Sequence, residues 1–336
     1  MRAYVLTAGC RGIDDLRLID RPTPRVGPGQ VRIRLRAATL NARDKAIVNG
    51  VYPPYAVTRD TVPLSDGAGE VAEVGAGVTR FKAGDRVVAS FFQPMAGLAL
   101  DQMPVQLGGP LDGVLQEEIV LDQDGVEPIP GDLSFAEAAS LPCAALTAWN
   151  ALMEAGGSLK PGDTVLVLGT GGVSIIGLQI AQAAGAQVIV TSSSDAKLER
   201  AKTLGAFGGV NYRTHPDWEK EVLRLTAGRG ADCILEVGGL GTFSHSLKAL
   251  APYGRIGLIG GFAGTVENLA FLRARRGSIH GIAVGTRDMF QRMNRTVAVK
   301  GIKPVVDRVF PFAHAADAFR LQESGDFFGK IAIAIG

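Results

Sequence analysis

A glycine-rich loop with the composition of a phosphate-binding site lies in residues 165–177, which read VLVLGTGGVSIIG. An apolar run precedes the glycines and another follows them, as expected for a strand, a turn and a helix. Glycines let the backbone approach a pyrophosphate, and the helix N-terminus supplies free N–H groups and a positive dipole. Ser174 replaces the usual third glycine and is small enough for close helix–strand packing. The expected dinucleotide contacts are Gly169, Gly171, Gly172, Val173 and Ser174.

The end of the next predicted strand favours NADP(H) over NAD(H). An NAD site usually has an acidic residue there, about 20 residues further on, that binds the ribose hydroxyls. Residues 191–194 read TSSS instead, and hydroxyl groups suit a 2′-phosphate that an acid would repel. Ser193, Lys197 and Tyr212 are expected to bind this phosphate, unless Lys197 is a solvated helix lysine. Asp195 argues against NADP(H), although an acid is also favoured in a first helical turn.

The elements that would position these residues fall into two regions that differ in expected secondary structure. Residues 1–125 are mostly β, with strands expected at 31–40, 69–78 and 85–91. The glycine- and proline-rich residues 92–113 predict a long loop, of a length that is often functional. From residue 127 helices dominate: residues 134–155 are helical on both sides of Pro142, and Ser134 with Glu137 forms a capping box.

Apolar runs then alternate with helical segments, for example the helix expected at 195–206. The runs are residues 164–169, 187–191, 208–212, 231–237, 254–260 and 278–284. This alternation predicts an α/β fold with a doubly wound parallel sheet, and it favours a dinucleotide site over a glycine turn of an unrelated sheet. The tail returns to β texture, so we expect one domain from 1–126 and 300–336 and a dinucleotide-binding Rossmann domain at 127–299.

Composition excludes several classes of protein. A chain of 336 residues with 46% hydrophobic and 20% charged residues can form two globular domains. The net charge of +2 gives no reason to expect nucleic acid or an anionic membrane as a partner. The uncharged residues 164–194 are long enough to span a bilayer, but glycines and glutamines interrupt them. The three cysteines and four histidines lack disulfide, metal or triad spacing, so a cytoplasmic protein is expected.

Four runs resemble the medium-chain dehydrogenase/reductase superfamily, in its zinc-independent alcohol-dehydrogenase-like and quinone-oxidoreductase-like branches. They are PLSDGAGEV (63–71), LPCAALTAWNAL (141–152), GTGGVS (169–174) and TSSSDAKLERAKTLGA (191–206). The resemblance covers essentially the whole chain and implies a Rossmann domain inserted in a GroES-like β domain. Ser193, Lys197 and Tyr212 match the quinone-reductase pattern of a small residue, Lys and Tyr, which supports NADP(H).

The resemblance also implies further cofactor contacts. Thr147 would lie near the nicotinamide, and the backbone around Gly260–Phe262 and Ala283–Gly285 would hold the carboxamide region. Lys330 matches a basic residue of the family that reaches the pyrophosphate, with a surface lysine as the alternative.

The positions of the family's catalytic zinc ligands differ in this chain. Asn41 stands in place of a cysteine, Ser65-Asp66 in place of a His-Glu pair, and Cys143 at the third ligand position. Catalytic zinc is normally held by three strong N, S or O⁻ ligands. The cysteine cluster of the structural zinc is absent too, so no metal is expected, and Cys143 is expected to be a small buried hydrophobe.

Without zinc, another group must stabilise the charge that develops on a substrate oxygen. Asn41 could donate an N–H to this oxygen, Tyr52 could donate a hydrogen bond or a proton, and Asp44 could orient a water or the ribose hydroxyls. Each has a structural alternative: Asn41 as a turn residue at a strand end, Asp44 as a helix cap, and Tyr52 as a pocket wall.

The sequence therefore predicts an NADPH-dependent, zinc-independent oxidoreductase that transfers hydride to a quinone or an α,β-unsaturated carbonyl. The alternatives are an NADP-dependent alcohol dehydrogenase or carbonyl reductase that acts without zinc, and an NADPH-binding sensor or structural protein without turnover. The partner is expected to be a small-molecule substrate of unspecified identity. The run 278–284 is a candidate edge strand. In resembling proteins the corresponding strand pairs across a two-fold axis, which implies a homodimer.

Overall fold

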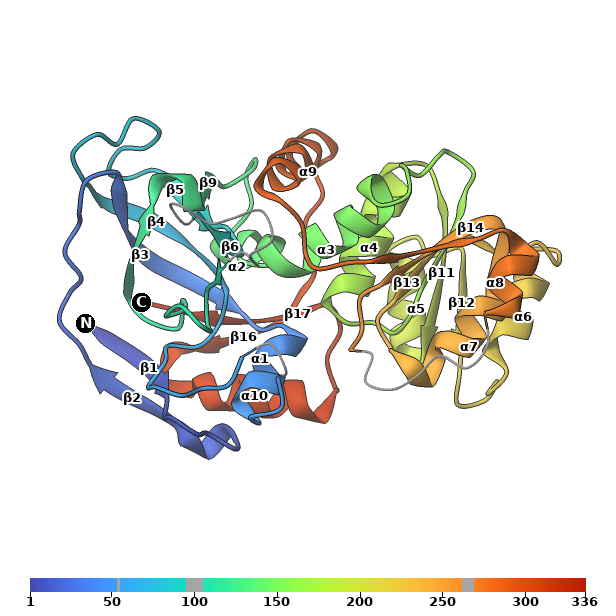
Figure 1. Ribbon diagram of the computed structural model, residues 1–336, viewed down its shortest axis with the longest axis horizontal. Helices are drawn as coiled ribbons and strands as arrows, with labels where there is room; N and C mark the ends of the chain where they lie inside the picture. Colours follow the sequence, from blue (N-terminus) through green and yellow to red (C-terminus); the bar gives the residue numbers. More distant parts are fainter. Residues whose placement is uncertain (53–54, 95–104, 262–268) are drawn as a thin grey trace. The chain divides into compact units, whose positions relative to one another are not determined.

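The structure, a computed structural model, describes residues 1–52, 55–94, 105–261 and 269–336. These residues form two compact units, one of Met1–Cys143 with Thr286–Gly336 and one of Ala144–Gly285 (Figure 1). The second unit is thus an insertion in the first, as the sequence predicts.

The limits of the inserted unit lie inside the expected limits of residues 127 and 299, because two flanking helices belong to the first unit. Helix α2 (Phe135–Ala138) contacts strands β3 and β4. Thr39 fixes the end of this helix by donating from Oγ1 to the Ala139 carbonyl at 2.8 Å. Helix α9 (Arg287–Lys300) is held to the first unit by Arg287, whose Nε donates to Glu127 Oε1 at 2.7 Å.

The first unit is built on a mostly antiparallel sheet. Its described strands follow the order β16-β17-β3-β4-β5-β9, and β8 also pairs with β3. They are β3 (Gln30–Thr39), β4 (Asp66–Val74), β5 (Arg86–Ala89), β8 (Glu118–Asp122), β9 (Val126–Pro128), β16 (Val306–Pro311) and β17 (Lys330–Ala334). Because β17 is antiparallel to β3, with Ala332 opposite Thr39, the tail rejoins the first unit as predicted.

Smaller elements complete this unit. They are the pairs β1 (Arg2–Leu6) with β2 (Leu16–Asp20) and β6 (Phe92–Gln93) with β7 (Val105–Gln106), helices α1 (Ala42–Val48) and α10 (Ala315–Ser324), and the 3₁₀ turns Ile13–Asp15, Gln123–Gly125 and Phe312–His314. The pair β6–β7 lies where the sequence predicts a loop at 92–113, of which 95–104 lies outside the described residues.

The helical segment 134–155 starts at the predicted capping box. The Ser134 N–H donates to Glu137 Oε2 at 2.7 Å, and the Glu137 N–H donates to Ser134 Oγ at 3.3 Å. Pro142, which has no N–H to donate, lies in a π-helical turn, Leu141–Ala145. Helix α3 (Leu146–Trp149) and a second π-helical turn, Asn150–Glu154, follow it.

The second unit contains the predicted parallel sheet. Its described strands follow the order β12-β11-β10-β13-β14-β15, and helices flank the sheet (Figure 1). The strands are β10 (Thr164–Val167), β11 (Gln187–Ser192), β12 (Gly208–Asn211), β13 (Ala231–Glu236), β14 (Leu250–Leu258) and β15 (Ser278–Gly281). The helices are α4 (Gly172–Ala183), α5 (Asp195–Thr203), α6 (Trp218–Leu225), α7 (Leu240–Ala249) and α8 (Ala270–Arg275). None of the helices in the described ranges is long and apolar enough to cross a membrane.

Helix α4 packs closely on this sheet through a glycine that the sequence reading did not single out. A Cβ on Gly177 would lie 2.5 Å from Leu235 Cδ1 and 3.6 Å from Ala148 Cβ. Ser174, expected to permit this packing, is buried and donates from Oγ to the Leu168 carbonyl at 2.6 Å. Ser174 therefore fixes the start of the helix against the end of β10, while Gly177 permits the close approach.

Candidate active site

The carboxyl end of β3 is where three strands of the first unit bring polar side chains together. The antiparallel register of β17 sets Lys330 beside the residues that follow Thr39 on one side. The register of β4 places Asp66 opposite Thr39 on the other side. Asn41 comes directly after β3 and is the N-cap of α1. We call the set Asn41, Asp44, Ser65, Asp66, Cys143 and Lys330 the β3-end cluster.

Lys330 supplies a buried positive charge to this cluster. Its side chain is 5% exposed, and its Nζ donates to Asn41 Oδ1 at 2.6 Å and to the Leu40 carbonyl at 2.8 Å. Asp66 Oδ2 lies 3.9 Å from the same Nζ. An ammonium only donates hydrogen bonds, so it fixes the orientation of the Asn41 amide: Oδ1 faces Lys330, and Nδ2 faces away as a donor.

Asp66 connects the remaining members of the cluster. Its Oδ1 accepts from Ser65 Oγ at 2.6 Å, and its Oδ2 accepts from the Cys143 backbone N–H at 3.1 Å. Ser65 Oγ also lies 3.4 Å from Asn41 Nδ2, a long contact that leaves this amide with N–H capacity. The four positions that the resemblance links to zinc ligands are therefore neighbours in space, with the ammonium of Lys330 among them.

Asp44 is a buried carboxyl group whose proton affinity the site alters. Its Oδ2 accepts from the Asn41 backbone N–H at 2.7 Å, as in the expected cap, and its Oδ1 lies 3.3 Å from Arg43 Nη1. Burial raises its pKa to about 6, Asp66 adds to the rise, and Arg43 and Lys330 oppose it. Asp44 can thus exchange a proton near neutral pH, which the sequence alone did not indicate.

Arg43, which the sequence reading did not select, anchors the neighbouring backbone. Its guanidinium is buried, and it donates from Nη1 to the Leu107 carbonyl at 3.1 Å and from Nη2 to the Gly109 carbonyl at 3.2 Å. The guanidinium also lies 5.4 Å from the centre of the Tyr52 ring and 5.3 Å from that of Phe91. Tyr52 therefore packs against the core of the first unit beside Arg43, and its expected role as a donor of a hydrogen bond or a proton stays a prediction.

The donor groups of the β3-end cluster are a poor fit to catalytic zinc. The four positions that correspond to zinc ligands supply an amide, a hydroxyl, one carboxylate and one thiol, and the carboxylate already accepts from the hydroxyl. A cation of the protein, Lys330, already pairs with the amide oxygen. Among the described residues, no set of three His, Cys, Asp or Glu is arranged to hold a metal ion. Catalytic zinc sites use three strong protein ligands, so no chemical step is assigned to zinc here.

The phosphate loop lies between β10 and α4, as predicted, and its backbone is open to a ligand. Gly169 has φ +72° and Gly171 is the N-cap of α4. A Cβ built on either glycine would meet no atom within 4 Å, so the space beside the loop is free for a phosphate. Gly172 and Val173 begin the helix and contribute to its free N–H groups. The loop therefore fits the pyrophosphate of a dinucleotide.

The residues expected to bind a 2′-phosphate follow β11 and β12. Ser193 comes after β11, and Lys197 lies in the first turn of α5. Tyr212 follows β12, is 42% exposed, and is joined to β11 by its N–H, which donates to the Ser192 carbonyl at 3.0 Å. The parallel pairing of β11 and β12 therefore places these residues at one edge of the sheet.

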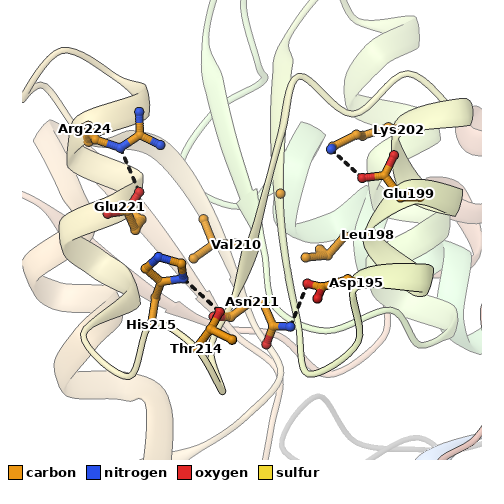
Figure 2. Close-up of a pocket in the computed structure, with 11 residues that line it drawn as sticks. Asp195, Leu198, Glu199, Lys202, Val210, Asn211, Thr214, His215, Glu221 and Arg224 are labelled. Atoms are coloured by element: carbon orange, nitrogen blue, oxygen red, sulfur yellow. Dashed lines mark hydrogen bonds and ion pairs between the residues drawn. The ribbon is translucent and has the colours of Figure 1, made fainter.

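Asp195, which argued against NADP(H), is hydrogen-bonded to Asn211 at the end of β12. Figure 2 shows Asn211 and Asp195 facing each other in a pocket of about 300 Å³ between α5, β12 and α6. Asn211 Nδ2 donates to Asp195 Oδ1 at 2.7 Å. The N-cap of α5 is Ser194, so Asp195 lies in the first turn, where its charge is favourable. This hydrogen bond and this position in the first turn agree with the structural role expected as the alternative for Asp195.

The residues assigned to the nicotinamide side lie at the opposite end of the sheet order. Gly260 follows β14, and Phe262 lies outside the described residues. Ala283 follows β15 in a turn where Val284 has φ +56°, and Asn150 Nδ2 holds this turn by donating to the Val284 carbonyl at 2.8 Å. Thr147 is buried on α3 of the same unit.

The site residues thus fall into two groups, one in each unit. Asn41, Asp44 and Lys330 form hydrogen bonds within the β3-end cluster. The dinucleotide contacts of the second unit follow the strands of the parallel sheet. The observed partners of Lys330 are the Leu40 carbonyl, Asn41 and Asp66, and its expected role at the pyrophosphate stays a prediction.

The pKa of Asp44 predicts a pH dependence of folding. A carboxyl group with a pKa of about 6 in the folded protein and an ordinary value of 3.8 binds its proton more tightly when folded. Its stabilising contribution is therefore present below pH 4 and is lost as the pH rises through 6. We expect the unfolding free energy of Asp44→Asn, minus that of the wild type, to increase by about 2 kcal/mol from pH 4 to pH 7 in urea titrations.

The exposed Asp20 offers the matched control. The variant Asp20→Asn removes the same charge outside the cluster, and its pH profile should run parallel to that of the wild type. A constant difference between Asp44→Asn and the wild type over this pH range would contradict the assignment.

Comparison with known proteins agrees with this architecture. Residues 27–131 match the alcohol dehydrogenase GroES-like domain, and residues 172–298 match the zinc-binding dehydrogenase family. A zinc-type alcohol dehydrogenase-like protein of Schizosaccharomyces pombe is 43% identical, with 99% of each chain covered. The synaptic vesicle membrane protein VAT-1 homolog of Rattus norvegicus is 31% identical over 100% of this chain and 84% of its own length.

A solved structure of an NAD-dependent alcohol dehydrogenase is 39% identical, covers 100% of both chains and has a TM-score of 0.91. These similarities confirm the expected fold class, a Rossmann domain inserted in a GroES-like domain. The chain therefore belongs to the medium-chain dehydrogenase/reductase superfamily, as an alcohol-dehydrogenase-like oxidoreductase whose fold binds a nicotinamide dinucleotide.

Proposed function

We propose that this protein is an NADPH-dependent oxidoreductase that acts without zinc and reduces a quinone or an α,β-unsaturated carbonyl. The observation that carries the proposal is the contact at 2.6 Å between the Lys330 ammonium and Asn41 Oδ1, in the cluster formed by the zinc-ligand positions. A bound nicotinamide would supply the hydride. The enolate or hydroquinone oxygen that results is stabilised by hydrogen bonds, so it does not require a metal.

Asn41 is the proposed donor to this oxygen. Lys330 holds the amide oxygen, so the amide N–H groups are oriented before a substrate binds. A donor fixed in advance costs no reorganisation when charge develops, which is the basis of oxyanion stabilisation. Lys330 is the positioning residue in this account, because it acts through Asn41.

Asp44 and Tyr52 have different roles in the proposal. The Asp44 carboxyl group, with a pKa of about 6, is a candidate to take up or release the proton that accompanies reduction. Its hydrogen bond to the Asn41 backbone N–H also couples its charge to the position of the donor. Tyr52 lies against Arg43 and is proposed to shape the substrate side of this wall.

The names of the relatives favour a second candidate function. The similar protein of Schizosaccharomyces pombe is described as alcohol dehydrogenase-like, and the solved structure is described as that of an alcohol dehydrogenase. The alternative is therefore the interconversion of an alcohol and a carbonyl without zinc, for which Asp44 would act as the base. Product analysis of an enone incubated with NADPH distinguishes the two, because reduction of C=C and of C=O gives different products.

The preference for NADP(H) rests on the ends of β11 and β12. Hydroxyl groups and Lys197 follow β11, and Asp195 is engaged by Asn211. The solved relative is described as an NAD-dependent alcohol dehydrogenase, which favours NAD(H) instead. The cofactor preference is thus a proposal for this chain, and so are the homodimer through β15 and the small-molecule substrate. β15 is an edge strand in the described sheet, which suits such pairing.

The substitution Asn41→Asp tests the proposed donor. An aspartate at this position keeps an oxygen for the Lys330 ammonium but has no N–H to donate. We expect kcat for enone reduction to fall about 100-fold, while the KM for NADPH and the melting temperature change little.

The control is Asn49→Asp, because Asn49 is the C-cap of the same helix α1 and lies outside the cluster. It should retain the wild-type kcat. Wild-type turnover by Asn41→Asp would exclude Asn41 as the donor.

The substitution Lys197→Ala tests the cofactor preference. Removal of a cation beside the 2′-phosphate should weaken NADPH binding about tenfold and leave NADH binding unchanged, because NADH lacks this phosphate. Titration of the nicotinamide fluorescence measures both dissociation constants. Tighter binding of NADH than of NADPH by the wild-type protein would refute the roles of Ser193, Lys197 and Tyr212.

A further inference from the structure

Glu236, at the end of β13, is a fully buried glutamate that collects four hydrogen bonds on its side chain. Its Oε1 accepts from the Gly238 N–H at 2.8 Å, the Gly239 N–H at 3.1 Å and Thr242 Oγ1 at 2.6 Å. Its Oε2 accepts from Ser246 Oγ. Burial of a carboxyl group is costly unless such partners are present. Glu236 therefore determines the conformation of the turn between β13 and α7.

The backbone of Glu236 connects this turn to the next strand end. Its carbonyl accepts from the Ile259 N–H at 2.9 Å and from the Gly260 N–H at 3.0 Å, where β14 ends. A Cβ on Gly260 would lie 2.6 Å from the Val237 carbonyl oxygen, so the two turns are in backbone contact. Gly239 has φ +78°, and its Cβ would lie 2.6 Å from the Gly261 carbonyl oxygen. One residue thus holds two glycine turns against each other.

The sheet order places these turns on one side of the phosphate loop. In doubly wound sheets a ligand binds outside the carboxyl ends of the strands, at the point where the strand order reverses. Here β10, which carries the loop, lies between β11 and β13. The adenosine side is assigned to β11 and β12, so the other half of a dinucleotide extends over the ends of β13 and β14.

We propose that Glu236 is a positioning residue for the nicotinamide half of the cofactor, which it serves by fixing the turns after β13 and β14. The inference rests on the proposed binding of NADPH. In this proposal different residues contribute to the binding of each half of the cofactor. Glu236 affects the nicotinamide half, and the residues after β11 and β12 affect the adenosine half.

A second buried glutamate supplies a control for effects on folding alone. Glu219 lies on α6, and its Oε2 is 2.6 Å from His245 Nδ1 on α7. Its Oε1 is 3.6 Å from Lys248 Nζ, which is also on α7. These contacts join two helices of the same unit, and they involve neither of the two glycine turns.

The test measures binding of NADPH and of 2′,5′-ADP, which is the adenosine half alone, to the full-length protein by calorimetry. In Glu236→Gln one side-chain oxygen remains for Gly238, Gly239 and Thr242, but these donors lose a carboxylate acceptor and bond instead to a neutral amide oxygen, so the turn contacts weaken. We expect NADPH to bind about tenfold more weakly and 2′,5′-ADP to bind as to the wild type. Thr242→Val removes one donor and should cause a smaller loss of the same kind. Glu219→Gln should leave both affinities unchanged, although its melting temperature falls.

Other outcomes contradict the proposal in distinguishable ways. Equal weakening of both nucleotides in Glu236→Gln would show a general structural effect, and no weakening would show that the turns do not serve the cofactor. If Glu236→Gln fails to fold, unchanged NADPH binding by Thr242→Val overturns the inference. Wild-type protein that binds neither nucleotide would refute the proposed function, and this inference with it.

Discussion

The burial of the Lys330 ammonium is the constraint on which the site in the first unit depends. An ammonium removed from water needs hydrogen-bond acceptors and a compensating charge. The Leu40 carbonyl and Asn41 Oδ1 accept from Nζ at 2.8 and 2.6 Å, and the Asp66 carboxylate is at 3.9 Å. These partners require β17, β3 and β4 to meet in one register. The same charge fixes the Asn41 amide, so the geometry of the proposed donor follows from the pairing of the strands.

The two units position their site residues in different ways. In the first, side chains far apart in the sequence meet where antiparallel strands end, and charge holds them together. In the second, turns after parallel strands present backbone groups, and glycines at 169, 171, 239 and 260 keep that backbone open or closely packed. In the second unit the buried carboxyl group of Glu236 accepts from a backbone N–H of a turn, and in the first unit Asp66 accepts from a backbone N–H in the same way. In both units, buried carboxyl groups maintain the geometry of residues proposed to act on a ligand.

Much of the fold was predictable from the sequence because it depends on local patterns. The apolar runs predicted the six described strands of the parallel sheet, and Ser134 with Glu137 predicted a helix start. The position of Lys330 was not predictable, because its partner Asn41 is 289 residues away and only the sheet register brings the two together. Arg43 was missed because a charged residue in a helix is usually exposed, and here it is buried between two aromatic rings. The close packing of α4 on the sheet at Gly177 was not predictable either, because no spacing rule for the phosphate loop singles out this glycine.

We propose that hydride transfer in this protein uses an oriented amide and buried charges in place of zinc. The donor groups of the β3-end cluster support it, although relatives include a zinc-type protein. The most direct measurement combines the zinc content of the purified protein with its turnover of an enone and NADPH, before and after dialysis against a chelator. The account predicts unchanged turnover at a zinc content far below one atom per chain. Turnover that disappears with the chelator and returns with added zinc would contradict it.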